Sequence, residues 1–192
     1  THQCVEDLAV FRAVPNMTVI CPADANETVE AVKAMAAMDG PCYLRLNRND
    51  YPNVTKEGAR FEIGVPRILK HGTDVALFAA GYMTGVALEA AKELEGSISV
   101  RVINVSTIKP MNKEVMRKMA EGCRAVVTAE EHNVAGGLGS AVAEALCEDP
   151  LPMKMVGIKD TFGCSGHNYQ EVLAYHGLTK EAVAEAVREM AG

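Results

Sequence analysis

The sequence lacks the features that mark two large classes of protein. None of its apolar runs approaches the roughly 20 residues that a helix needs to span a bilayer. It has no run of basic residues, and its formal net charge is −6 at pH 7. An acidic chain without a basic stretch has little to attract a phosphate backbone. We therefore expect neither a membrane nor a nucleic acid among its partners.

Cysteine occurs six times but never in a C-x-x-C pair, and neighbouring cysteines are at least 17 positions apart. This spacing disfavours both a disulfide scaffold and a zinc site, and it fits a reducing, cytoplasmic compartment. Cys21, Cys42 and Cys147 stand in apolar stretches, where a thiol behaves as a small hydrophobic group. The others are Cys4, Cys123 and Cys164.

The hydrophobic pattern alternates between short apolar runs and stretches with helical spacing. Hydrophobic residues make up 48% of the 192 residues and charged residues 23%, which is typical of a globular protein with a sizeable core. In "PADANETVEAVKAMAAMDG", Asp24 is the expected helix cap, and Glu27 is expected to reach back to it. "DVALFAAG" is a continuous apolar run, which indicates a strand covered on both faces. The remaining strands are expected in 17–21, 42–46, 99–106, 125–131 and 153–158, and the remaining helices in 4–14, 84–95, 112–120, 138–147, 168–175 and 180–190.

Strands that alternate with single helices predict an α/β fold with a mostly parallel sheet. The polar segment 47–66 has no sustained period and reads as a linker of about twenty residues. We expect an incomplete parallel α/β unit over 1–57, a linker over 58–65, and a complete three-layer α/β domain over 66–192. An incomplete unit has an open sheet edge, so residues 1 to about 50 are expected to be loosely held, swapped, or paired with another chain.

The most motif-like stretch is "EEHNVAGGLGSAVAEAL", where Gly136, Gly137 and Gly139 stand between a strand and a helix. Bare backbone N–H groups at a helix start can hold an anion. However, the spacing matches neither G-x-G-x-x-G nor a P-loop. We favour tight packing of the helix on the sheet as the role of these glycines, and anion binding is the alternative.

Three further sets of polar residues are candidates for catalysis: the pair Glu130 and Glu131, the single residue His132, and the pair Ser165 and His167. Glu130 and Glu131 are adjacent on a strand, so their side chains point to opposite faces and cannot pair. His132 is more readily explained as a hydrogen-bonded structural group than as a base. Ser165 and His167 begin a helix, where a serine usually caps, and no G-x-S-x-G motif surrounds Ser165, which disfavours a hydrolase.

Arg45 and Arg48 lie at and just after the end of the strand in "CYLRLNRNDYP". Ligands of parallel sheets gather outside the carboxyl ends of the strands, and arginine can bind a phosphate through two parallel hydrogen bonds. From the residues alone, phosphate binding and a structural ion pair are equally good explanations of these arginines.

The stretches "THQCVEDLAVFRAVPNMTVICPADANET", "YLRLNRNDYP" and "EEHNVAGGLGSAVAEAL", in this order, resemble the C-terminal part of a transketolase. The resemblance covers essentially the whole chain and is greatest to the bacterial and archaeal forms that are split into two polypeptides. It implies that residues 1–57 are the second half of a pyrimidine-binding domain and that 66–192 are the C-terminal domain. It also implies that the chain starts inside a domain, with its preceding strands upstream.

The resemblance further implies two site residues. His2 matches the histidine that lines the family's active-site channel, contacts the sugar hydroxyls and handles protons, which makes it a catalytic and substrate-binding candidate. Arg48 matches the arginine that binds the sugar phosphate. Thiamine diphosphate and Mg²⁺ are implied for the full enzyme, but the family's metal motif and the glutamate that activates the cofactor have no counterpart here.

The implied activity is the transfer of a two-carbon ketol unit from a ketose phosphate to an aldose phosphate, as in the pentose phosphate pathway. We expect this chain to be inactive alone, to need a subunit or section with the diphosphate-binding domain, and to form a dimer or other homo-oligomer through its C-terminal domain. Two alternatives remain open. One is another thiamine diphosphate enzyme, either deoxyxylulose-phosphate synthase or the β subunit of a 2-oxoacid dehydrogenase. The other is a non-catalytic dimerisation or regulatory module.

Overall fold

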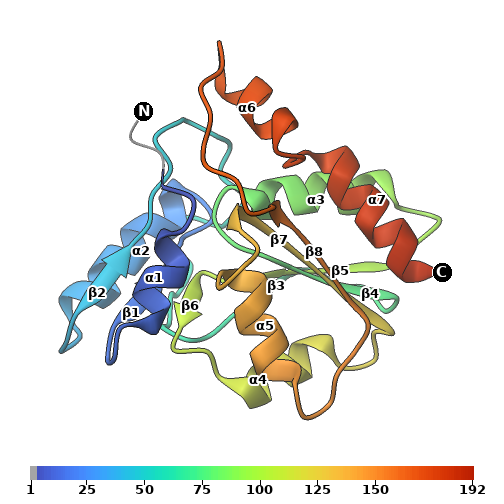
Figure 1. Cartoon of the computed structure of the whole chain (residues 1–192). Coiled ribbons are helices and arrows are strands. Elements are labelled where there is room, and N and C mark those ends of the chain that lie inside the picture. The colour runs from blue at the N-terminus through green and yellow to red at the C-terminus, as the bar shows by residue number, and fades with distance from the viewer. Residues whose placement is uncertain (1–3) are drawn as a thin grey trace.

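The structure is a computed structural model that describes residues 4–192, so the predicted site residue His2 lies outside the described residues. It is an α/β fold with two sheets and helices packed against them (Figure 1). The strands are β1 (Thr18–Ile20), β2 (Cys42–Leu44), β3 (Arg67–Lys70), β4 (Val75–Ala79), β5 (Val100–Asn104), β6 (Thr107–Lys109), β7 (Ala125–Asn133) and β8 (Met153–Ile158). The helices are α1 (Asp7–Ala13), α2 (Ala25–Ala36), α3 (Met83–Glu93), α4 (Lys113–Ala120), α5 (Leu138–Leu146), α6 (Tyr169–Tyr175) and α7 (Lys180–Ala191).

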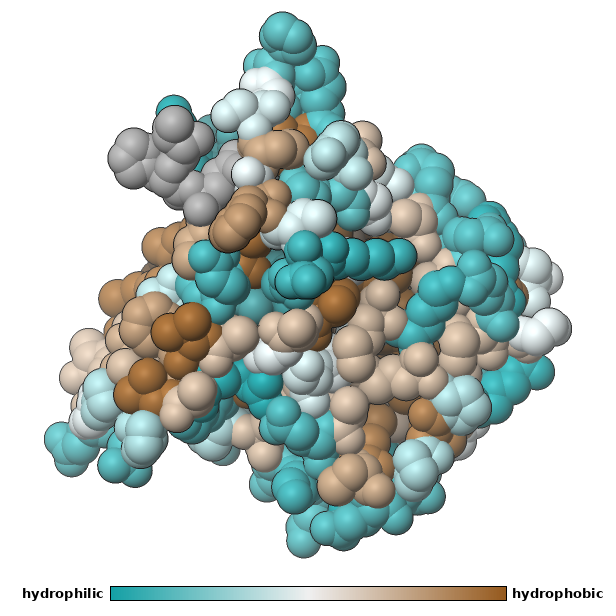
Figure 2. Space-filling view, viewed as in Figure 1, coloured by the Kyte–Doolittle hydropathy of each residue, from teal (hydrophilic) through white to brown (hydrophobic). Residues whose placement is uncertain are grey.

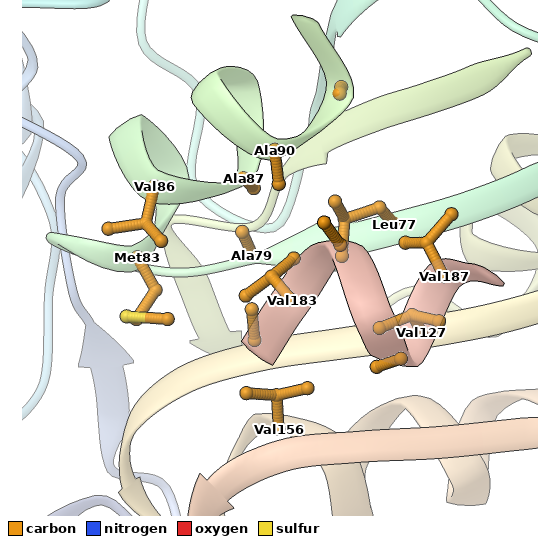
Figure 3. Packing of buried hydrophobic residues seen from close by; sticks show 14 of the residues in the cluster. Leu77, Ala79, Met83, Val86, Ala87, Ala90, Val127, Val156, Val183 and Val187 are labelled. Atoms are coloured by element: carbon orange, nitrogen blue, oxygen red, sulfur yellow. The ribbon is translucent and has the colours of Figure 1, made fainter. Parts of the chain in front are cut away.

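The larger sheet has the strand order β3-β5-β4-β7-β8, and its strands are parallel except for β3, which runs antiparallel to β5. Every residue of β4 is buried, as its continuous apolar run predicts. Leu77 and Ala79 of β4 belong to the hydrophobic cluster with α3 and α7 (Figure 3), whereas Ala76 and Phe78 belong to the cluster with α4 and α5. Helices therefore cover both faces of this sheet, and the predicted mostly parallel α/β fold is confirmed.

The smaller sheet has the order β2-β1-β6 and draws on distant parts of the sequence. β1 pairs in parallel with β2 and antiparallel with β6. The sequence predicts one strand over 99–106, but β5 ends at Asn104, and β6 then crosses to β1. At the crossing, Val105 N–H donates to the Ala79 carbonyl and Cys21 N–H donates to the Ser106 carbonyl. One strand of the smaller sheet, β6, thus comes from the part of the chain that was expected to form a separate domain.

The predicted cap of α2 is confirmed. The Asp24 carboxylate accepts a hydrogen bond from the N–H of Glu27 at 2.9 Å, and the Glu27 carboxylate accepts one from Ala23 N–H at 2.7 Å. The same Glu27 carboxylate accepts a hydrogen bond from Asn104 Nδ2 at 2.9 Å. Both side chains are buried, so the helix cap also joins α2 to β5.

Helix α1 is bonded both to the smaller sheet and to the loop after β7. Lys109 Nζ donates to the carbonyls of Arg12 and Val14 at the end of α1, and Arg12 donates to the Gly136 carbonyl at 2.6 Å. These contacts favour attachment of α1 within the chain, and the expectation that residues 1 to about 50 are loosely held, swapped or paired with another chain stays a prediction. Among the described residues β2 has a partner strand on one side only, so it is an open edge of the smaller sheet. Apolar side chains are exposed over α1 (Figure 2), where Val10 is 57% exposed.

The cysteines are all free thiols, and all six lie within the described residues. Cys21 and Cys123 are buried, but Cys147 is exposed, contrary to its predicted place among apolar neighbours, because it follows the last residue of α5 at the surface. Between residues 4 and 192, no helix has the length and hydrophobicity to cross a membrane.

Candidate functional site

A cavity of about 630 Å³ lies where the segment after β2 faces the loop after β8 and α6. Arg45, Asn47 and Arg48 line it from the first side, Glu131 from β7, and Tyr169 from α6. This is the position at which parallel strands end and ligands usually bind. The cavity is built from both halves of the chain, so neither half could form it alone.

Its floor contains an ion pair between α1 and the end of β2. Arg45 Nε lies 3.1 Å from a carboxylate oxygen of Asp7, and the Tyr43 hydroxyl donates to the same carboxylate at 2.6 Å. The Arg45 side chain is 16% exposed and also donates to the Cys4 carbonyl. For Arg45, the structure therefore favours the structural ion pair over phosphate binding.

A second polar cluster ties the loop after β2 to the larger sheet. Asn47 Nδ2 donates to Glu131 at 2.9 Å and to the Tyr169 hydroxyl at 2.5 Å, and this hydroxyl donates to the other oxygen of Glu131 at 2.7 Å. Burial raises the pKa of the Glu131 carboxyl, and Arg45 and these two hydrogen bonds oppose the rise. We call Asn47, Glu131 and Tyr169 the loop clamp, because it fixes the residue next to Arg48.

Arg48 itself lines the cavity with an exposed side chain. Among the ion pairs between residues 4 and 192, none includes Arg48. A guanidinium at the rim of a cavity, fixed through its neighbour, is arranged to meet an anion that enters from solvent.

The N–H groups after the glycine-rich segment are bonded to a side chain of the protein itself, Glu130. The Glu130 carboxylate accepts hydrogen bonds from the N–H groups of Leu138 and Gly139, at 2.6 and 2.8 Å, at the start of α5. A Cβ atom on Gly137 would overlap this carboxylate, and one on Gly136 would lie 2.6 Å from the Cβ of Ala9. The glycines therefore permit close packing, as predicted, and the N–H groups at this helix terminus are bonded to the Glu130 carboxyl group.

His132 is a structural group. It is fully buried, and its Nδ1 donates to the Asn133 carbonyl at 2.6 Å, while Nε2 accepts from the N–H of Ala9 at 3.4 Å. Burial lowers the pKa of the imidazole, although the bond to Asn133 and the Asp7 charge oppose the shift. The predicted separation of the two glutamates is also borne out. Glu130 is bonded to the start of α5, whereas Glu131 points the other way, into the loop clamp.

Ser165 and His167 lie in the exposed loop before α6 and make no hydrogen bond to each other. The expectation that Ser165 caps this helix is wrong. Asn168 is the cap, and its side chain accepts a hydrogen bond from Glu171 N–H at 2.9 Å. An asparagine next to the helix satisfies this donor, so a serine three residues earlier is not needed.

The described residues do not fit the metal-bound part of the implied cofactor. Across residues 4–192, no group of three or more His, Cys, Asp and Glu side chains is placed to hold a metal ion. The acidic and histidine side chains near the cavity are instead bonded to protein groups, as Asp7, Glu131 and His132 are.

Family models match the chain in two consecutive segments. The transketolase pyrimidine-binding domain matches residues 1–54, and the transketolase C-terminal domain matches residues 64–183, which is more than half of the chain. The chain belongs to the transketolase family. The resemblance that the sequence motifs carried is thereby confirmed.

Relatives in this family match the sequence along nearly the full length of the chain. A putative transketolase C-terminal section from Methanocaldococcus jannaschii is 40% identical over 98% of this chain and 60% of its own length. A 6-deoxy-6-sulfo-D-fructose transketolase subunit from Clostridium is 40% identical over 99% of this chain and 59% of its own length. A solved structure described as a split gene transketolase, inactive beta4 tetramer, is 46% identical, with a TM-score of 0.94 over 99% of this chain and 63% of that one.

The chain thus spans about 60% of the length of these split-gene relatives. A 1-deoxy-D-xylulose-5-phosphate synthase from Thioalkalivibrio sulfidiphilus is also 35% identical over 98% of this chain, but over 29% of its own length. The names of these relatives describe different reactions, so the matches show the family and not the reaction.

Sequence reasoning missed most of the polar side chains around the cavity. Asp7, Asn47 and Tyr169 were not singled out, although all three line it. One signal was available for Asn47, because it stands between two arginines just past a predicted parallel strand. Nothing local indicates Asp7 or Tyr169, whose partners lie 36 or more residues away in the sequence.

Proposed function

We propose that this chain is the C-terminal section of a split transketolase, which transfers a two-carbon ketol unit from a ketose phosphate to an aldose phosphate. Thiamine diphosphate and Mg²⁺ would be bound by a partner subunit or upstream section with the diphosphate-binding domain. In this proposal residues 1–57 belong to the pyrimidine-binding domain, residues 58–65 are a linker, and residues 66–192 form the C-terminal domain. His2 is the proposed catalytic residue, and Arg48 binds the phosphate.

The observation that carries this proposal is Arg48 at the rim of a polar cavity in a transketolase-family chain. A sugar phosphate needs hydrogen-bonding groups along the sugar and a cation at its end. The cavity provides the cation, because Arg48 lies at its rim beside the residue that the loop clamp fixes. A module that served dimerisation alone would have no use for this arrangement.

Isolated, the chain should be inactive and oligomeric. The similar solved structure is described as an inactive beta4 tetramer, and within residues 4–192 no metal-binding cluster is present here. We expect no turnover of xylulose and ribose phosphates by the purified chain, and turnover after the diphosphate-binding subunit is added. Ordinary turnover by the chain alone would contradict the proposal.

Arg48→Ala in the reconstituted enzyme tests the substrate class. Loss of a charge-assisted hydrogen bond of about 1.5–3 kcal/mol should raise the KM for phosphorylated sugars about 10- to 100-fold and leave unphosphorylated sugars unaffected. Arg60→Ala is the control, because Arg60 is 86% exposed and pairs with Glu62 outside the cavity. An unchanged KM would favour the non-catalytic module.

The alternative among thiamine diphosphate enzymes is deoxyxylulose-phosphate synthase, which the relatives of that name support. Donor choice separates the two. The proposal requires xylulose phosphate to serve as donor in the reconstituted enzyme and pyruvate to fail. Turnover of pyruvate with glyceraldehyde phosphate would assign the chain to the alternative.

A further inference from the structure

A cysteine and a histidine are in contact beside the cavity. The Sγ atom of Cys164, in the loop after β8, lies 3.4 Å from Nε2 of His176, the residue that ends α6. At this distance the thiol can donate its hydrogen to the imidazole. Neither residue takes part in the loop clamp or in the ion pair of Asp7 with Arg45.

The pair can be reached from solvent. Cys164 is partly exposed and lines a hollow of about 540 Å³, with His167, Glu171 and Tyr175 on its other sides. A hollow of this size accommodates a small organic molecule. Ser165 and Gly166 line both this hollow and the cavity of the candidate site, so they form a wall between the two.

The other cysteines lack this combination of access and a base. Cys21 and Cys123 are buried, and burial raises the pKa of each thiol, to about 11 for Cys21. Cys4 and Cys147 are exposed and Cys42 is partly exposed, but none of the three hydrogen-bonds to an imidazole within the described part of the chain, and burial raises the pKa of the Cys42 thiol. The thiolate is the reactive form of cysteine, and an adjacent histidine generates it by accepting the proton.

We propose that Cys164 is a modification site, at which His176 activates the thiol for exchange with a low-molecular-weight disulfide. The proton passes from Sγ to Nε2, and the thiolate attacks one sulfur of the disulfide. A new S–S bond forms as the old one breaks, and the departing thiolate takes the proton from the imidazolium. The product is a mixed disulfide at Cys164 and one free thiol, so atoms and electrons balance without another reactant.

The adduct would stand against the wall of Ser165 and Gly166 and remove the contact of Cys164 with His176, which itself lines the larger cavity. Oxidation would thereby alter the shape of the candidate site. This consequence for activity rests on the proposed function, but the modification itself does not.

The test uses the full chain with glutathione disulfide at pH 7.4, with peptide mass spectrometry to measure the rate at each cysteine. Proton transfer to the adjacent imidazole supplies the reactive thiolate, and the lower nucleophilicity of a stabilised thiolate offsets part of this advantage, so we take about a tenfold gain in rate as the expected effect. We expect Cys164 to react about tenfold faster than the exposed Cys147. Equal rates at the two would overturn the proposal, whatever the activity of the enzyme.

Two variants test the base. His176→Asn should slow Cys164 about tenfold and leave Cys147 unchanged. His167→Asn, in the same hollow but without a hydrogen bond to Cys164 among the described residues, should change neither rate. Fast reaction of Cys164 in folded His176→Asn protein would remove His176 from the mechanism. If that variant does not fold, the ratio of Cys164 to Cys147 in the unaltered chain still decides the proposal.

Discussion

Replacing Glu130 with Gln should change how the stability of the protein depends on pH. The carboxyl is 1% exposed, and burial raises its pKa to about 7, although the N–H groups of Leu138 and Gly139 and the charge of Arg12 oppose the rise. Because the pKa is higher in the folded state, the folded protein retains this proton over a range of pH in which the unfolded chain has lost it. The stabilisation is therefore complete below the ordinary value of 4.5 and is lost as the pH rises through about 7.

The size of the effect follows from the same values. The difference between about 7 and 4.5, at about 1.4 kcal/mol for each pH unit, corresponds to about 3.5 kcal/mol. Gln has no proton to lose, so this change disappears in the variant. The Gln amide can accept from one N–H of α5 but presents its NH₂ group to the other, which costs about 1–3 kcal/mol at every pH.

Urea unfolding at pH 5 and pH 8 measures both quantities. We expect Glu130→Gln to be less stable than the unaltered protein at pH 5. By pH 8 the difference in the free energy of unfolding should shift by about 2.5 kcal/mol in favour of the variant, which is less than the full value because pH 5 already lies above 4.5. The pKa of His132 is lowered by burial, so its contribution is lost as the pH falls, and it largely cancels because both proteins contain it. If the difference between the proteins is the same at both pH values, the start of α5 fully compensates the buried charge, and the reasoning is refuted.

Two more substitutions test how the parts are joined. Tyr169→Phe removes the hydroxyl that donates to Glu131 at 2.7 Å, so the free energy of unfolding at pH 8 should fall by about 2 kcal/mol in a urea titration. Tyr175→Phe is the control, because Tyr175 is 77% exposed and its replacement should have no effect in the same titration. Lys109→Met removes the donor to the carbonyls of Arg12 and Val14, so the amide protons of α1 should exchange faster with deuterium. Lys113→Met is the control, because Lys113 lies at the exposed start of α4 and its replacement should leave the exchange of α1 unchanged. Equal stability of the two Phe variants, or unchanged exchange in Lys109→Met, would contradict these contacts.

Elements with a strong local pattern could be predicted from the sequence. The apolar run of β4 and the Asp24 and Glu27 cap of α2 depend on neighbouring residues, and both were predicted correctly. β3 lies at the edge of the larger sheet, where it pairs antiparallel with β5, and it has a charged residue at each end. It therefore lacks the apolar run that marks a buried strand, and the sequence did not predict it. β6 is three residues long, and it is a strand because β1 lies beside it.

The candidate site was predictable in its position but not in its contacts. The end of a parallel strand indicated Arg45 and Arg48, yet the sequence could not tell an ion pair from a ligand contact for either. The answer for Arg45 depends on Asp7, which is 38 residues away in the sequence. Such a pairing is set by the packing of α1 on β2, and no local pattern contains it.

The crossing of β6 bears on how the two proposed domains relate. A boundary within residues 58–65 would assign β6 to the C-terminal domain, yet β6 pairs with β1 and carries Lys109, which binds the end of α1. Glu27 and Asn104 join the halves a second time through a buried contact, and the loop clamp joins them a third time at the cavity. Because buried polar contacts are costly to leave unmade, these links favour a fixed relation between the halves over independent motion. The cavity that holds Arg48 at its rim can therefore keep one shape, which is the preorganisation that selective binding of the proposed sugar phosphate would require.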